Sequence, residues 1–192
     1  NTSGNTVIDN CDELTDWSGD NTLSLNSNYH QQGRSCVEAN GNSIIDFQKV
    51  LSSPVNTGVV LTKAKLQMWY YISDVSLLAD ENQVELGSAG AADVDEYSWT
   101  ISKDELHNGW NFVSLNFSDA TVIGSPDINA INWFRLSREK TGDLLSRIDY
   151  IQVVTDDMPK PGMPTAVYPK DGAGGIDVNV ALDWIAGKNA LE

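Results

Sequence analysis

The sequence alternates most strictly in Leu66-Gln67-Met68-Trp69-Tyr70-Tyr71-Ile72. Successive side chains of a β-strand point to opposite faces of its sheet. The stretch therefore predicts a strand in which Leu66, Met68, Tyr70 and Ile72 face a core, while the three residues between them face outward.

Short runs of the same kind recur along the chain, and turn residues such as Asn40-Gly41-Asn42 and Thr141-Gly142-Asp143 separate them. The predicted strands are residues 23–26, 35–39, 44–50, 65–72, 83–87, 96–101, 111–117, 131–137 and 147–153. Helical periodicity is almost absent, and we expect one helical turn between residues 73 and 82. Regularly spaced short strands with polar turns are typical of an all-β, antiparallel β-sandwich.

The composition excludes several classes of partner. Asp and Glu outnumber Lys and Arg by 27 to 12 over 192 residues, which gives a formal net charge of −15. Nucleic acid and anionic membrane surfaces both require clustered Lys and Arg. No apolar run approaches the length of a membrane span, so we expect no membrane insertion. An acidic chain rich in Asn and Ser suits a secreted or cell-surface protein.

The two cysteines, Cys11 and Cys36, leave two interpretations open. The segment between them predicts loop, strand and turn, which can bring its ends together. We predict a disulfide, which would stabilise the fold by about 3 kcal/mol. The alternative is a pair of free, buried thiols.

Motifs that carry catalysis are missing from the sequence. His30 and His107 lack metal-ligand spacing, and no nucleophile elbow, P-loop or dinucleotide fingerprint occurs. Acidic pairs such as Glu85 and Glu96 arise by chance in so acidic a chain. We therefore expect this fragment not to be an enzyme.

The composition changes near the C-terminus. Four of the six prolines lie between Pro159 and Pro169, directly after the last predicted strand. We predict a β-sandwich domain over residues 1–154, a Pro-rich linker over 155–169, and over 170–192 the truncated start of a following β module. That last segment resembles the opening of an immunoglobulin- or fibronectin-type module, and its closing Leu191-Glu192 resembles a vector-derived tail.

Motifs spread over residues 7–154 carry a second resemblance. They include Val7-Ile8-Asp9-Asn10-Cys11-Asp12, Gln32-Gly33-Arg34-Ser35-Cys36, Ala130-Ile131-Asn132-Trp133-Phe134-Arg135 and Arg147-Ile148-Asp149-Tyr150-Ile151. Their order resembles the galactose-binding-domain-like jelly rolls that serve as carbohydrate-binding modules in secreted bacterial polysaccharide-degrading enzymes. The resemblance implies a noncatalytic, monomeric module that targets a covalently attached enzyme to a polysaccharide. The alternative is a structural spacer or protein-interaction module in an extracellular multi-modular protein.

Alternation also suggests a sugar site. If the apolar neighbours face the core, six outward residues offer flat rings and planar polar groups: Trp69, Tyr71, Gln83, Glu85, Trp133 and Arg135. Aromatic plates suit the C–H faces of sugar rings, and the polar groups suit hydroxyls. The charge of −15 favours a neutral plant or algal polysaccharide. In the alternative, a loop covers this face and the residues form a second small core.

The resemblance also implies a structural Ca²⁺ between the end of the first strand, an early loop and the last strand. Asp9 and Asp149 would supply carboxylates, and the segment from Gln32 to Ser35 would supply carbonyls. Asp149 interrupts the inward parity of Ile151, where an unpaired carboxylate is costly. The alternative is that Asp149 pairs with Arg34 or caps a turn.

Overall fold

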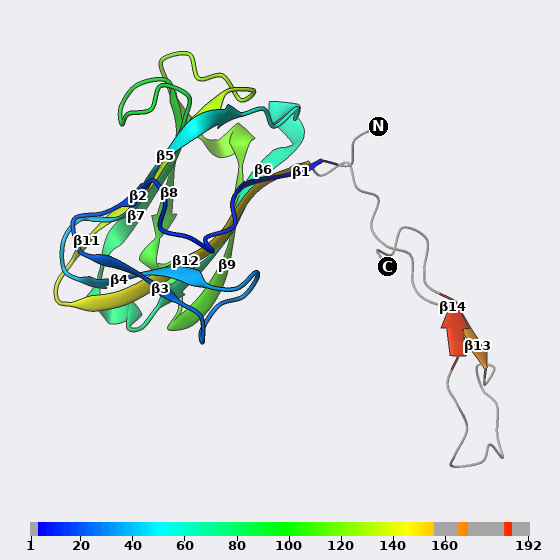
Figure 1. Ribbon diagram of the computed structural model, residues 1–192, viewed down its shortest axis with the longest axis horizontal. Coiled ribbons are helices and arrows are strands. Elements are labelled where there is room, and N and C mark those ends of the chain that lie inside the picture. The colour runs from blue at the N-terminus through cyan, green and yellow to red at the C-terminus, as the bar shows by residue number, and fades with distance from the viewer. Residues whose placement is uncertain (1–3, 156–164, 169–182, 186–192) are drawn as a thin grey trace, which may run out of the picture. The chain divides into compact units, whose positions relative to one another are not determined.

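The computed structural model (Figure 1) describes residues 4–155, 165–168 and 183–185, and residues 4–155 form two antiparallel six-stranded sheets. In sheet A the order is β3 (Leu23–Asn26), β4 (Cys36–Gly41), β12 (Leu144–Thr155), β6 (Ala64–Ile72) and β9 (Gly109–Asn116), and β1 (Asn5–Asp9) also pairs with β12. In sheet B the order is β10 (Thr121–Ile123), β8 (Glu96–Ser102), β7 (Leu78–Gly87), β11 (Ile131–Lys140), β5 (Ile45–Val55) and β2 (Trp17–Ser18). The predicted antiparallel β-sandwich is confirmed.

Helical structure in the described chain is limited to short 3-10 turns. They are η1 (Leu61–Lys63), η2 (Val75–Leu77), η3 (Lys103–Glu105) and η4 (Phe117–Asp119). The second confirms the helical turn expected between residues 73 and 82. Alternation did not reveal β2 and β10, because strands of two and three residues are too short to show a period.

The core fills the space between the two sheets. On β6 the side chains of Leu66, Met68, Tyr70 and Ile72 are fully buried, as their alternation predicts. Sheet B faces them with residues of the same alternating kind, including Val84, Leu86, Tyr97, Trp99, Phe134 and Leu136. The outer face of each sheet is therefore left to the residues of opposite parity.

A bulge in β12 changes the parity of its second half. Tyr150, at φ 51°, and Ile151 together oppose a single residue of β6, because Asp149 pairs with Trp69 and Gln152 with Gln67. Asp149 thus lies on the outer face of sheet A, beside Trp69, while Ile151 is in the core. The prediction that Asp149 shares the inward parity of Ile151 is wrong for this reason.

A group of opposite charges is buried where β11 pairs with β5. Arg138 and Lys140 of β11 both form ion pairs with Asp46 of β5, at 2.6 and 2.5 Å, and all three side chains are at most 1% exposed. Arg138 also stacks on the ring of Tyr70, 4.8 Å from its centroid. Burial is the main influence on Arg138 and lowers its pKa to about 10. The sandwich therefore encloses two cations around one anion.

The contacts divide the chain into two units, residues 1–156 and 157–192. In the second unit, β13 (Thr165–Tyr168) pairs with β14 (Asp183–Ile185). Thr165–Tyr168 falls inside the predicted linker of residues 155–169, and its β-branched and aromatic residues favour a strand. Asp183–Ile185 falls inside the predicted start of a following module, and Thr155 ends β12; the other residues of the two predicted segments lie outside the described residues. None of the described helices is long and apolar enough to cross a membrane.

Candidate functional site

Cys11 and Cys36 are free, buried thiols, so the predicted disulfide is wrong. The Cys36 Sγ atom instead donates to the carbonyl oxygens of Tyr29, at 3.2 Å, and Asn26, at 3.6 Å. Burial raises the pKa of both thiols, to about 12 for Cys36. The structure therefore contains the pair of free, buried thiols that the sequence left open as the alternative to a disulfide.

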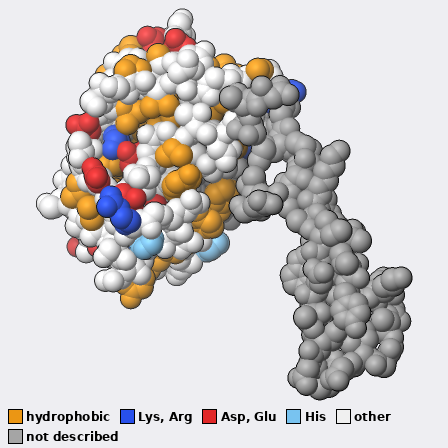
Figure 2. Space-filling model, turned by 45° about the vertical axis from the view of Figure 1, so that its right-hand side comes forward, with side chains coloured by type: hydrophobic (Ala, Val, Ile, Leu, Met, Phe, Trp, Pro, Cys, Tyr) orange, Lys and Arg blue, Asp and Glu red, His pale blue; other side chains and the backbone are white. Residues whose placement is uncertain are grey.

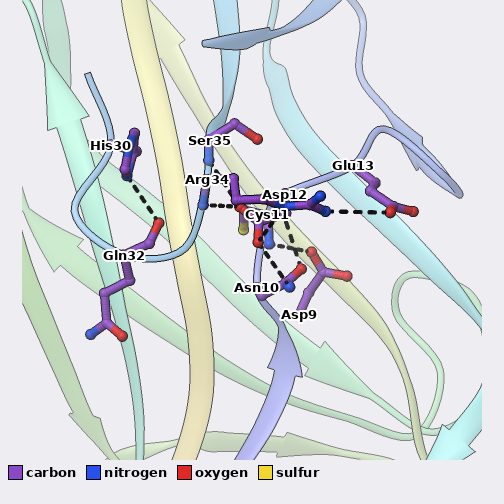
Figure 3. Close-up of polar contacts among 9 residues, drawn as sticks. All are labelled: Asp9, Asn10, Cys11, Asp12, Glu13, His30, Gln32, Arg34 and Ser35. Carbon is purple, nitrogen blue, oxygen red and sulfur yellow. Dashed lines mark hydrogen bonds and ion pairs between the residues drawn. The ribbon is translucent and has the colours of Figure 1, made fainter. Parts of the chain in front are cut away.

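Of the residues predicted to bind calcium, Asp9 ends β1, and Gln32 and Ser35 lie in the loop between β3 and β4 (Figure 3), while Asp149 belongs to β12. Asp9 is already occupied: its Oδ1 accepts from the N–H of Cys11 and from Trp17 Nε1, and its Oδ2 pairs with Lys49. Asp149 Oδ2 accepts from the backbone N–H of Gln31 and Gln32, at 2.6 and 2.9 Å. Arg34 pairs with Asp12 and Glu13 rather than with Asp149.

This arrangement presents backbone N–H groups to the carboxylates, whereas a calcium site requires oxygen ligands. The N–H of Ser35 points to Asp12, and the carbonyl of Gln32 lies 3.2 Å from His30 Nδ1. Although burial opposes ionisation, the N–H groups of Arg34 and Ser35 hold the pKa of Asp12 below its usual value. The four predicted ligands do not fit Ca²⁺ as arranged. The unpartnered, buried Oδ1 of Asp149 is the one feature in its favour, and calcium here stays a prediction.

The six predicted sugar-binding residues do not lie together. Trp69 and Tyr71 are on β6, on the outer face of sheet A, whereas Gln83 and Glu85 are on β7 and Trp133 and Arg135 on β11, on the outer face of sheet B. Alternation assigns a residue to a face of its own strand, but it does not say to which sheet that strand belongs. The two groups must be considered as separate candidate surfaces.

On sheet B, Trp133 points away from the main core, as predicted, but it is only 1% exposed. Its ring packs against Gly87 of the neighbouring β7, and the Arg135 guanidinium lies 5.3 Å from its centroid. Arg135 is itself bonded through Nε and one terminal nitrogen to both oxygens of Glu85, which is 0% exposed. The prediction of an open site is wrong at Trp133 and Glu85, because both side chains are buried.

The same face of sheet B is more open further along β7. A groove of about 540 Å³ is lined there by residues of β7, β8 and β11, including Gln83, Thr100 and Ser137. Gln83 is exposed, and its Nε2 donates to Ser98 Oγ at 3.0 Å. This groove offers hydroxyls and amides, but its lining residues include no aromatic ring.

Three carboxylates gather beside Arg135. Among the described residues, Glu85, Asp93 and Glu96 form the one group of three potential metal ligands whose oxygens lie within 4.8 Å of one another. Burial and then the neighbouring Glu85 raise the pKa of Glu96 to about 7. Its Oε2 accepts from the N–H of Asp93, while its buried Oε1 has no hydrogen-bond partner within the described chain.

Sheet A carries an aromatic surface of a different kind. Trp69 lies opposite Phe112 and Tyr71 opposite Trp110, so four rings pair across β6 and β9. The ring centroids are 4.9 Å apart in the first pair and 5.5 Å in the second. Phe112 is 50% exposed, and Tyr29, in the loop after β3, is 62% exposed. We call Tyr29, Trp69, Tyr71, Trp110 and Phe112 the aromatic face.

Polar groups accompany these rings. The Arg147 guanidinium lies 4.4 Å from the Tyr71 centroid and 5.1 Å from that of Tyr29, and its Nε donates to Glu38 Oε2 at 2.6 Å. Two amides and a hydroxyl form a row across three strands of sheet A. Gln152 donates a hydrogen bond to Gln67, and Gln67 donates one to Ser114. A groove of about 310 Å³ reaches Phe112 and Ser114. Figure 2 shows hydrophobic side chains open to solvent on one face of the molecule, beside acidic and basic ones.

Sequence reasoning found two of the five rings of the aromatic face. In the predicted strand of residues 111–117, Val113 and Leu115 pack in or against the core, so alternation would place Phe112 outward and, one step further, Trp110 as well. Tyr29 lies in a loop with no period, and nothing in the sequence marked it. Arg147 begins a predicted strand, and nothing in the sequence marks it as a neighbour of the rings.

Neither protein-family models nor curated proteins match this chain, but solved structures do. A family 11 carbohydrate-binding module from Clostridium thermocellum, in complex with a β-1,3-1,4-mixed-linked tetrasaccharide, superposes with a TM-score of 0.58 at 11% identity, over 81% of this chain and 98% of that one. The fold is the β-sandwich of such modules. A family 30 module of a cellulosomal cellulase from the same organism gives a TM-score of 0.50 at 11% identity, over 71% of this chain and 83% of that one. An exo-β-agarase gives 0.52 at 12% identity, over 78% of this chain and 24% of the agarase.

Proposed function

We propose that this chain binds a polysaccharide without cleaving it, through the aromatic face of sheet A. The observation that carries the proposal is the pairing of Trp69 with Phe112 and of Tyr71 with Trp110 on a sheet surface that is partly open to solvent. Monomeric proteins rarely leave such contiguous rings uncovered without a use for them. Rings held rigidly by neighbouring strands lose little entropy on binding.

The chemistry of the surroundings favours sugar as the ligand. A pyranose ring presents an apolar C–H face and a rim of hydroxyls, so it needs a flat ring next to directional donors and acceptors. Arg147 and Gln67 supply planar donors beside the rings, and Glu38 supplies an acceptor. The net charge of −15 repels polyanions at long range, which favours a neutral plant or algal polysaccharide.

The similar folds support the same proposal and extend it. The family 11 and family 30 modules are described as parts of cellulosomal cellulases, and the agarase match covers only a quarter of a longer enzyme. By analogy with them, we propose that this chain is a monomeric, extracytoplasmic module, attached to a carbohydrate-active enzyme that it brings to its substrate. The alternative of a spacer or protein-interaction module predicts no retention by any glycan.

The test begins with the 192-residue chain on an array of neutral plant and algal polysaccharides, followed by affinity electrophoresis in gels that contain the best ligand. Trp69→Ala should weaken retention about tenfold or more, since central aromatic anchors contribute about 2 kcal/mol or more to binding. Val122→Ala is the matched control, because this exposed apolar residue lies on β10 at the edge of sheet B.

Two further measurements locate the site and exclude catalysis. Gln83→Ala changes the groove of sheet B, and loss of retention in this variant alone would move the site to that sheet. Absence of binding to every glycan would favour the spacer. Release of reducing sugar from the ligand would contradict the noncatalytic role.

A further inference from the structure

A buried acidic cluster on sheet B has a geometry that the sugar proposal does not use. Glu85 belongs to β7, Glu96 begins β8, and Asp93 lies in the loop that joins these strands. Gly87 lies opposite Glu96, and an added Cβ there would come within 3.4 Å of the Glu96 Cβ and 3.3 Å of the Trp133 ring. The glycine thus allows Glu96 and Trp133 to pack closely at this corner.

One oxygen of the cluster lacks the partner that its burial requires. Glu96 is 0% exposed, and its Oε1 accepts no hydrogen bond from the residues that the structure describes. The same side chain places an oxygen within 4.8 Å of oxygens of Glu85 and Asp93. A buried oxygen that makes no hydrogen bond is costly, and a bound cation would remove that cost.

The charges of the cluster match a divalent ion. The three carboxylates interact electrostatically with one guanidinium, that of Arg135, which donates hydrogen bonds to both oxygens of Glu85. Fully ionised, these four groups sum to a charge of −2, which one divalent cation neutralises. Asp93 is exposed, so an ion can reach the cluster from solvent. All candidate ligands are carboxylate oxygens, which suit hard cations and not zinc or copper.

We propose that Glu85, Asp93 and Glu96 bind one Ca²⁺ ion that holds the loop between β7 and β8 against sheet B. Ca²⁺ takes six to eight oxygens in flexible geometry, so the three carboxylates bind it together with water. The ion site is independent of the sugar proposal, because the aromatic face belongs to sheet A. It is also distinct from the residues around Asp9 and Asp149.

The experiment is a Ca²⁺ titration by calorimetry on the full chain after removal of metal by chelation, with melting temperatures measured in parallel. We expect one saturable site and a rise in Tm of about 5 °C at one hundred times the dissociation constant. Asp93→Asn should lower the affinity at least tenfold, since it removes one charged ligand from an exposed position and leaves the fold intact. Asp143→Asn removes the same charge in the turn between β11 and β12, and it should bind Ca²⁺ as the parent does.

Further variants keep the test decisive. Glu96→Gln should abolish the Ca²⁺-dependent rise in Tm; if this variant does not fold, the exposed Asp93→Asn still decides. No saturable binding by the parent chain would overturn the proposal, and so would parental affinity in Asp93→Asn. Loss of binding in Asp149→Asn, with Asp93→Asn unaffected, would also overturn it and would place the ion near the end of β1.

Discussion

Trp69 and Phe112 face each other across neighbouring strands of sheet A, with ring centroids 4.9 Å apart and planes inclined at 56°. Phe112→Leu retains apolar area at this position but removes the flat ring. If sugar rings stack here, retention by the polysaccharide should fall about tenfold, while the free energy of unfolding changes by less than about 1 kcal/mol. Affinity electrophoresis and urea denaturation measure the two effects. Unchanged retention in Phe112→Leu would exclude this ring from the site.

Trp133→Ala should have the opposite effects: a large loss of stability and no loss of retention by the polysaccharide. Because it is buried against Gly87 and Arg135, Trp133→Ala should destabilise the chain by about 3–5 kcal/mol, as other large core truncations do. Under conditions in which circular dichroism shows the variant folded, retention by the polysaccharide should match the parent. A selective loss of retention in the folded variant would bring the sugar site back to sheet B.

The thiols give a test of the redox state. Cys11 and Cys36 are buried, and burial raises the pKa of Cys36 to about 12, so neither is a thiolate at pH 8. A thiol reagent such as DTNB should react very slowly with the native protein. After unfolding without reductant it should titrate both cysteines of the chain. No free thiol after unfolding would show that a disulfide exists after all.

Removal of Asp46, the anion that Arg138 and Lys140 share, should lower the free energy of unfolding. Asp46→Ala leaves Arg138 and Lys140 buried without a counter-charge, which should cost about 3–5 kcal/mol in urea denaturation. Asp143→Ala, in an exposed turn, should change the stability by no more than about 0.5 kcal/mol. Equal effects of the two substitutions would mean that the cluster does not contribute to stability.

The fold could be predicted from the sequence because the signal is local. The alternation that buries Leu66 and Ile72 is set by the chemistry of consecutive residues, and the predicted strand starts within one residue of β6. Positions that depend on a bulge could not be predicted in this way. Tyr150 takes a positive φ in β12, and this single change moves Asp149 to the opposite face.

The candidate site was predicted less well, because it depends on which strands become neighbours. Trp69 and Trp133 both point away from the core, yet β6 and β11 belong to different sheets. The exposed fraction of a side chain could not be predicted from the sequence either, since Trp133 is buried by residues that pack against it only in the folded chain. Parity alone assigns a side chain to a face and says nothing of what covers that face.

The register of sheet A has a consequence for the length of the ligand. Trp110, Tyr71, Arg147 and Glu38 lie opposite one another on four adjacent strands, so they form a line perpendicular to the strands. Strands are about 4.8 Å apart, which makes this line about 14 Å long. A single sugar would contact only one or two of these four residues. Affinity should therefore rise with each unit added to an oligosaccharide and level off once the chain crosses all four strands.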